Sequence, residues 1–249
     1  MDMKGKVFIV AGGGRDIGRS CALALAKRGA NIVLTYHSSS GAALNVVKEV
    51  ESYGVSAIAL RADLTQEAEA NGVVAAALEG FGHLNGLVHV SGGLLERIKI
   101  EDMSLQHWHN VMNVNLTSLF MMAHATIPHL KDGDSIVTFA SQAGRDGGGG
   151  GAVAYATSKG AIMTFTRGLA KELGAKNIRV NSVCPGMIST GFHDQFTQDE
   201  IRTKVAAATA LKREGTADEV GSLVAFLMSQ EASFMTGNCV DINGGLLFS

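Results

Sequence analysis

The sequence predicts one α/β domain spanning residues 1–249, with a doubly wound parallel sheet of about seven strands and helices on both faces. Short apolar, β-branched runs alternate with longer stretches of helical periodicity, which is typical of a parallel sheet covered on both sides. No Pro/Ser-rich linker divides the chain, so one domain is favoured over two. We expect the strands at residues 7–11, 31–35, 55–60, 87–90, 135–140, 178–183 and 239–242.

The stretches between these runs are predicted to form the covering helices, because apolar residues recur in them at helical spacing. Two capping-box patterns mark helix starts. Thr197 with Glu200 precedes an additional helix, and Thr216 with Glu219 precedes the last long one. The long helices are expected at residues 18–28, 40–53, 66–80, 104–129, 153–174 and 217–229.

The composition argues against several classes of function. Hydrophobic residues make up 46% of the chain, enough for a large core, and the net charge of −2 would not attract nucleic acid or acidic lipid. The amino terminus enters the first apolar strand without a leader, and no apolar run is long enough to span a membrane. We therefore expect a cytoplasmic protein without nucleic-acid or membrane partners.

The cysteines and histidines indicate neither a disulfide framework nor a metal site. Cys21, Cys184 and Cys239 are widely separated and odd in number, which favours reduced packing residues. His107 and His109 look like a metal pair, but no third ligand follows at convincing spacing. We expect no bound metal.

The most informative residues are Tyr155 and Lys159, four positions apart, with Ser141 fourteen residues before Tyr155 at the end of a predicted strand. This separation places phenol and ammonium on one helix face, where a cation favours ionisation of a tyrosine whose free pKa is about 10. Ser141 can supply a hydroxyl to a reacting carbonyl. The set predicts a proton-transfer site. Glycines 147–151 separate its two parts, either as a mobile entrance wall or as a tolerated surface linker.

A glycine-rich turn follows the first predicted strand and opens the first helix, which is the order that a dinucleotide site requires. Gly12 would make the turn, and Gly18 would let the helix and strand approach each other. Backbone amides at the helix start would face the pyrophosphate. Arg15 could contact a ribose 2′-phosphate.

The order of these motifs resembles the short-chain dehydrogenase/reductase family along nearly the whole chain. The resemblance implies a Rossmann-type fold and a glycine turn that normally reads Thr-Gly-x-x-x-Gly-x-Gly. Here Ala11 occupies the threonine place and Asp16 the middle glycine place, although Gly12 with Gly14 offers an alternative register. The cofactor would then contact the residues of this turn, namely Gly12, Gly14, Arg15, Asp16, Ile17 and Gly18.

Three later segments carry the same resemblance. Asp63 and Leu64 fall where the family holds the adenine, and Asn115 corresponds to the family's catalytic asparagine. The segment that closes over the nicotinamide is matched by Pro185, Gly186, Ile188 and Thr190.

A fourth segment departs from the family pattern. Ser91 and Gly92 lie where the family usually reads Asn-Asn-Ala-Gly, and the glycine would permit close passage of the cofactor. His89 and Val90 replace both asparagines. The hydrogen bonds that those asparagines make in the central sheet must therefore be made by other groups.

The choice of cofactor is argued from charge. The second strand leads into Tyr36, His37 and Ser38, with no acidic residue to bind a free 2′-hydroxyl or repel a 2′-phosphate. NADP(H) is therefore favoured over NAD(H), with Arg15 and serine hydroxyls receiving the phosphate. The alternative is that Arg15 is a solvated loop cation and that NAD(H) serves.

The resemblance also implies roles in catalysis. Tyr155 would give a proton to the carbonyl oxygen in reduction, and Ser141 would orient that oxygen. Lys159 would lower the pKa of Tyr155 and bind the nicotinamide ribose, while Asn115 would hold a water that links Lys159 to solvent. Ser141 and Tyr155 stand one residue farther apart than in the usual pattern, and a bulge in the glycine tract could absorb the extra residue.

The substrate is less well defined than the reaction. Gln142, Arg145 and Asp146 could line the mouth of the site, which suggests a polar or anionic carbonyl compound such as a keto sugar or keto sugar acid. The equal alternative is that they are solvated loop residues. A 3-oxoacyl-thioester reductase is an alternative within the family, and a non-catalytic NADP(H)-binding regulator is an alternative of another class. Residues 186–215 are expected to form a substrate loop and helix. The resemblance further implies a homo-oligomer, most commonly a tetramer.

Overall fold

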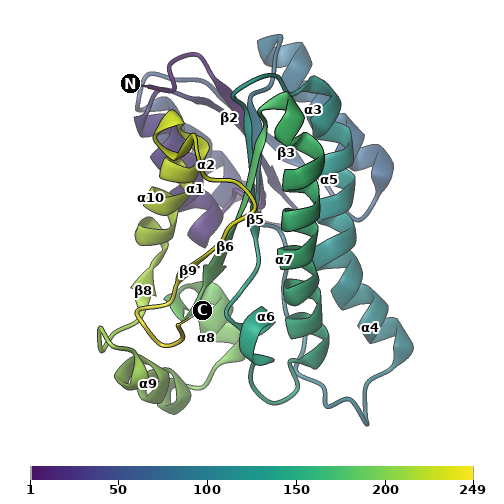
Figure 1. The fold of residues 1–249 in the computed structure, drawn as a ribbon, viewed down its shortest axis with the longest axis vertical. Coiled ribbons are helices and arrows are strands. Elements are labelled where there is room, and N and C mark those ends of the chain that lie inside the picture. Colours follow the sequence, from purple (N-terminus) through teal and green to yellow (C-terminus); the bar gives the residue numbers. More distant parts are fainter. Residues whose placement is uncertain (1, 249) are drawn as a thin grey trace.

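The fold is built on one parallel sheet of seven strands, and the computed structural model describes residues 2–248 (Figure 1). The strand order is β3-β2-β1-β4-β5-β6-β9, so the direction of winding reverses between β1 and β4. This is the doubly wound arrangement that the sequence predicts. The strands are β1 (Val7–Ala11), β2 (Asn31–Tyr36), β3 (Ala57–Arg61), β4 (Gly86–His89), β5 (Ser135–Phe139), β6 (Arg179–Pro185) and β9 (Cys239–Ile242).

Two helical layers cover the sheet (Figure 1). Alternate residues of β1 point into different layers: Phe8 and Val10 pack into one core, while Val7 and Ile9 pack into the other. Because both faces are buried, the strands read as continuous apolar runs. One layer contains α1 (Asp16–Lys27), α2 (Ser40–Glu51) and α10 (Ala217–Met228), and the other contains α3 (Glu67–Phe81), α5 (Ser118–Thr126) and α7 (Val153–Leu173).

The prediction of a single helix at residues 104–129 is wrong in detail. The structure divides it into α4 (Leu105–Met112), a π-helix at Asn113–Thr117, α5 and a short 3₁₀ turn at Ile127–His129. These pieces follow one another without an intervening loop, so the sequence shows no break at the junctions. The π-helix is informative because such insertions often occur at functional sites.

One of the two predicted capping boxes is present. Thr216 accepts a hydrogen bond from the Glu219 amide, and the Glu219 carboxylate accepts one from the Thr216 amide. The box predicted at Thr197 is wrong, because α9 (Asp199–Ala208) begins after Gln198. The Thr197 hydroxyl instead contacts Nδ1 of His193 at 2.9 Å.

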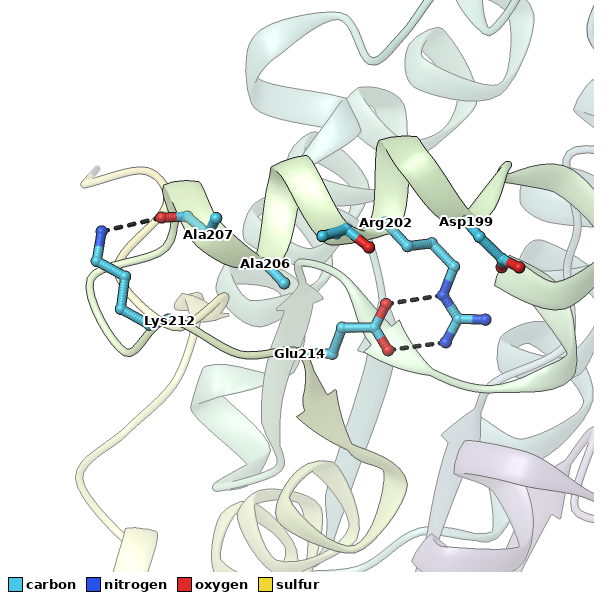
Figure 2. Close-up of a pocket in the computed structure, with 7 residues that line it drawn as sticks. Asp199, Arg202, Ala206, Ala207, Lys212 and Glu214 are labelled. Carbon is cyan, nitrogen blue, oxygen red and sulfur yellow. Dashed lines mark hydrogen bonds and ion pairs between the residues drawn. The ribbon is translucent and has the colours of Figure 1, made fainter.

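Residues 186–215 form an outlying group at the lower end of the sheet in Figure 1. Arg202 of α9 holds this group together, because its guanidinium donates two hydrogen bonds to Glu214 and also pairs with Asp194. Figure 2 shows the paired Arg202 and Glu214 at a surface hollow that contains none of the expected site residues. Besides α9, the group comprises β7 (Ile188–Ser189), α8 (Gly191–Phe196) and β8 (Gly215–Thr216).

Among residues 2–248, no helix combines the length and the apolar character needed to cross a bilayer. The same part of the chain contains no cluster of three or more His, Cys, Asp or Glu side chains that could hold a metal ion.

Candidate active site

The expected site residues gather at the carboxyl edge of the central strands. In a doubly wound sheet, ligands bind at this edge where the strand order reverses. Here the reversal lies between β1 and β4. Gly12 follows β1, Ser91 and Gly92 follow β4, Ser141 follows β5, and Pro185 ends β6.

The glycine turn after β1 has a shape that only glycine permits. Gly12 adopts a φ of +81°, and a Cβ there would lie 2.9 Å from the backbone nitrogen of Ser91. A Cβ on Gly18 would lie 2.0 Å from the carbonyl oxygen of Gly12, so α1 and β1 approach each other closely. Gly12 and Gly13 donate backbone hydrogen bonds to Thr35, which fixes the turn against β2.

The turn fits a dinucleotide. Arg15, the N-cap of α1, provides no side-chain cap, so amides of the first helical turn remain for an anion. Arg15 is exposed and can reach a phosphate, while Gly14 lies against Tyr36, where a Cβ would be 3.4 Å from the Tyr36 Cβ. His37 and Ser38 follow and are exposed. Ile17 packs against the core below them.

Asp16 occupies its position with a φ of +48°, the left-handed conformation that favours glycine. Its carboxylate points toward α8, where Oδ1 accepts a hydrogen bond of 3.3 Å from the Gly191 amide. The Arg15 Nε lies 3.8 Å from the other carboxylate oxygen. Asp16 therefore links the glycine turn to the outlying group, a contact that the sequence did not indicate.

Asp63 follows β3 and is held in a local turn. Its carboxylate accepts hydrogen bonds from the backbone amide and the hydroxyl of Thr65, and these bonds hold the pKa of Asp63 below its usual value. Leu64 beside it is buried. Farther along the edge, Ile188 and Thr190 are buried, and a Cβ on Gly186 would lie 2.7 Å from the Asn243 Cβ.

Asn115 lies in the π-helix and fastens it to the loop after β4. Its Oδ1 accepts from the Gly93 amide, and its Nδ2 donates to the carbonyl oxygens of Gly93 and Val111. A Cβ on Gly92 would lie 2.5 Å from Asn115 Oδ1 and 3.3 Å from Lys159 Nζ. Asn115, Gly92 and Lys159 therefore meet at one point of the edge.

Lys159 and Tyr155 share a face of α7, as their spacing indicates. Lys159 is buried, donates a hydrogen bond of 2.8 Å from Nζ to the Phe139 carbonyl, and lies 5.6 Å from the Tyr155 ring centroid. Burial lowers the pKa of Lys159 to about 8. Ser141 lies close enough to hydrogen-bond with Tyr155, and its Oγ also accepts from the Ala143 amide.

The ionisation of Tyr155 differs from the expectation. Burial raises the pKa of the phenol, and the opposing influence is the hydrogen bond with Ser141 rather than the Lys159 charge. The reason is geometric, because the ammonium is hydrogen-bonded to Phe139 and faces the ring rather than pairing with an ionised oxygen. The phenol of the free protein is therefore protonated at neutral pH.

His89 ends β4 and Val90 follows it, at the positions where the resemblance implies two asparagines. The His89 side chain is fully buried, with Nε2 3.3 Å from the Ser118 hydroxyl. Burial, assisted by the nearby positive charge of Lys159, lowers the pKa of His89 to about 3, so the imidazole is neutral. The loop after β4 receives its hydrogen bonds from Asn115 instead.

Two residues expected at the mouth are engaged elsewhere. Arg145 forms an ion pair of 2.8 Å with Asp241 and donates to the Cys239 carbonyl, so its guanidinium fastens α6 (Ala143–Asp146) to β9. This geometry contradicts a free substrate-binding role for Arg145. Asp146 accepts from Gln142 Nε2 and from the Gly148 amide. Gln142 keeps one buried acceptor, Oε1, without a hydrogen-bond partner among the described residues.

Several positions of the glycine tract have backbone conformations that favour glycine. Gly147, Gly148 and Gly151 have φ values of +88°, +70° and +73°, and Gly147 ends α6 in a left-handed conformation. The carbonyl oxygens of Gly150 and Gly151 accept hydrogen bonds from Arg97 and Ile98. The tract is thus anchored to the loop after β4.

Sequence reasoning missed an aromatic residue beside the proposed acid. The centroid of the Phe192 ring lies 6.0 Å from that of Tyr155. The repetition of phenylalanine at positions 192 and 196, one helical turn apart in the segment already expected at the substrate, was an available signal.

Comparison with known proteins decides the family. The family model described as Enoyl-(Acyl carrier protein) reductase matches residues 11–247. The chain is a short-chain dehydrogenase/reductase. It is an oxidoreductase acting on CH-OH and carbonyl groups, with the Rossmann fold of that family.

Two relatives of this short-chain dehydrogenase/reductase cover almost the whole chain. An uncharacterized oxidoreductase of Methylorubrum extorquens is 36% identical over 98% of this chain and 98% of its own length. A hydroxynaphthalene reductase-like protein, Arp2, of Metarhizium brunneum is 34% identical over 98% of this chain and 95% of its own.

Two similar structures contain a bound nucleotide. A short-chain dehydrogenase from Burkholderia cenocepacia in complex with NADP is 32% identical, with a TM-score of 0.91, and the match covers 99% of both chains. A blue fluorescent protein from a metagenomic library in complex with NADPH is 31% identical, with a TM-score of 0.93 and the same coverage. Both complexes are consistent with the dinucleotide fit of the glycine turn.

Because the ammonium of Lys159 is buried, we expect the free energy of unfolding to depend on pH in a specific way. The folded protein loses this proton near pH 8, before the unfolded chain does near 10.5, so the free energy of unfolding should rise between those pH values. Replacing Lys159 with Met removes this pH-dependent contribution to the free energy of unfolding. The stability difference between Lys159→Met and the parent should therefore shift by roughly 3 kcal/mol in favour of the parent from pH 7 to above pH 10.

Urea denaturation of the cofactor-free proteins at a series of pH values measures this difference. Comparing variant with parent cancels the titration of all other groups. A difference that stays constant with pH would show that Lys159 has an ordinary pKa.

Proposed function

We propose that the chain is an NADP(H)-dependent reductase that interconverts a small-molecule carbonyl and the corresponding secondary alcohol. One observation carries the proposal: Tyr155, Lys159 and Ser141 meet beside Asn115 and Gly92, next to the glycine turn. When bound, the cofactor would supply or accept the hydride. The protein supplies binding, orientation and the proton.

Different parts of the edge would hold different parts of the cofactor. The turn from Gly12 to Gly18 and the amides at the start of α1 fit the pyrophosphate. Arg15 with Ser38 would bind the 2′-phosphate, and Asp63 lies where the adenine is expected. Lys159 would bind the nicotinamide ribose. The nicotinamide end is expected along Ser91, Gly92, Pro185, Gly186, Ile188 and Thr190.

Proton transfer is assigned to Tyr155. Burial raises the pKa of its phenol, so it is protonated at neutral pH, as an acid for carbonyl reduction must be. The Ser141 hydroxyl would hold the substrate oxygen within reach of that proton. Lys159 would then assist return of the proton.

Asn115 would support a water that connects Lys159 to solvent. Both hydrogens of its amide are engaged with the carbonyls of Gly93 and Val111. The water would therefore bind at the acceptor capacity left on this residue.

For the substrate, a keto sugar or keto sugar acid and a 3-oxoacyl thioester are the candidates suggested by the sequence. The support for an anionic substrate is reduced, because Arg145 is paired with Asp241. Among the described residues, Oε1 of Gln142 has no hydrogen-bond partner. It could accept a hydrogen bond from a hydroxyl or amide group of the substrate. A reductase assay with members of each class would distinguish them.

We also propose a homotetramer. Large apolar side chains lie exposed on α4 and α5, including Leu105 and Phe120, and Phe234 lies exposed after α10. Contact with another subunit would bury these side chains. Sedimentation equilibrium should give about four times the 26.0 kDa chain mass. A monomer at micromolar concentration would contradict the proposal.

Tyr155→Phe tests the assigned acid. Removing the phenol oxygen should lower kcat by at least about a hundredfold while NADPH binding is retained, because general acid catalysis contributes about 10²–10⁴-fold. NADPH oxidation followed by absorbance, with ketones, keto sugars and 3-oxoacyl thioesters, measures turnover. Tyr53→Phe, at the end of α2, is the matched control and should match the parent.

If Tyr155→Phe reacted as fast as the parent, Tyr155 would not be the acid. If the parent binds NADPH but turns over none of the substrates, the non-catalytic regulator becomes the better account.

Arg15→Ala tests the cofactor preference. Loss of the guanidinium should raise KM for NADPH about tenfold or more and leave KM for NADH nearly unchanged, since only NADPH carries the 2′-phosphate. Initial rates with both cofactors give the ratio. Equal effects on both would show that Arg15 does not read the 2′-phosphate.

A further inference from the structure

The geometry points to a flat, apolar ketone as the substrate class, with Phe192 as the residue that selects it. This inference rests on the proposed reductase function and refines it. The ring of Phe192 faces Tyr155 with the planes tilted by 35° and the centroids 6.0 Å apart. A substrate whose carbonyl reaches the Tyr155 hydroxyl therefore has an aromatic face beside it.

The aromatic face extends beyond one ring. The centroid of Phe196 lies 5.1 Å from that of Phe192, because residues four apart lie on the same side of α8. Both phenylalanines are partly buried, so part of each ring remains accessible. Tilted contacts at these distances are those by which aromatic rings attract one another, and a planar ligand can extend the same series.

A charged group at the end of this face, Arg97, is already engaged within the protein, because it donates to the carbonyl oxygens of Phe196 and Gly150. Asp194, two residues from Phe192, lies on another side of α8 and pairs with Arg202. A substrate carboxylate would have to displace the contacts of Arg97 in order to pair with this guanidinium. An apolar ring would not, and its transfer from water would add the hydrophobic contribution.

Helix α8 is held in place at both ends. At its start, Asp16 of the cofactor turn accepts from the Gly191 amide at 3.3 Å. At its end, Arg97 Nε donates to the Phe196 carbonyl at 3.1 Å, while Nη1 donates to the Gly150 carbonyl at 3.1 Å. Arg97 thus joins α8 to the glycine tract. We assign Arg97 as a positioning residue that keeps Phe192 over Tyr155.

Phe192→Ala tests the selection by two readouts, turnover and binding. Turnover is measured with NADPH and either acetophenone, a planar aryl ketone, or dihydroxyacetone, a hydroxylated aliphatic ketone. The parent should have the higher kcat/KM for acetophenone. Phe192→Ala should raise KM for acetophenone about tenfold with kcat within about threefold, and leave dihydroxyacetone nearly unchanged.

Binding is measured by titrating acetophenone into the enzyme loaded with NADP⁺, a complex that cannot react. The parent should bind acetophenone about tenfold more tightly than Phe192→Ala does. If this difference is found without turnover of any ketone, the reductase function fails while the aromatic site stands. If turnover is found without a difference in either readout, the aromatic site fails alone.

Two further variants exclude a general effect on folding. Tyr53→Ala removes an aromatic ring at the far end of α2 and should leave KM for both ketones unchanged. Phe192→Tyr keeps the ring and should retain the acetophenone preference. A parent enzyme that prefers dihydroxyacetone, or an equal loss on both ketones in Phe192→Ala, would overturn the inference.

Arg97→Ala tests the positioning role. Freed from Arg97, α8 should hold Phe192 less firmly, so KM for acetophenone should rise severalfold while kcat stays near the parent value. Arg97→Lys, which keeps the charge and can make one of the two hydrogen bonds, should recover part of the loss. Unchanged KM in Arg97→Ala would remove the positioning role.

Discussion

Burial of both faces of a parallel sheet is the constraint on which the rest of the structure depends. Apolar side chains fill the two helical layers, so polar chemistry is confined to the edges of the sheet. The carboxyl edge is the one that carries functional groups here, because loops after β1, β4, β5 and β6 meet there. Gly12 and Gly18 allow backbone segments to approach closely, and Gly92 leaves room for the side chains of Asn115 and Lys159.

At that edge, burial changes the ionisation of the polar groups. Lys159 is inserted between the end of β5 and Gly92, where loss of water lowers its pKa to about 8. The neighbouring His89 stays neutral for the same reason. The π-helix gives Asn115 the placement from which it fastens the loop after β4. A folded protein tolerates such a costly ammonium only where its large core supplies ample stability.

The sequence predicted those structural features that are determined by the spacing of nearby residues. The seven strands, the long helix α7 and the shared face of Tyr155 and Lys159 follow from periodicity. The ion pair of Arg145 with Asp241 could not be predicted, since 96 residues separate its members. The π-helix was hidden because it continues directly from α4 into α5, with no loop residues to mark it. Phe192 was missed because its contact with Tyr155 depends on how α8 folds back.

The glycine tract between Ser141 and Tyr155 has a consequence for how this enzyme could diversify. The tract begins at the end of α6 and leads into α7, so Ser141 before it and Tyr155 after it are held by other elements of the fold. The entropy of closing a loop rises only with the logarithm of its length, by about 0.6 kcal/mol for each doubling. Insertions and deletions that keep the contacts of Gly150 and Gly151 with Arg97 and Ile98 would therefore reshape this loop at low thermodynamic cost.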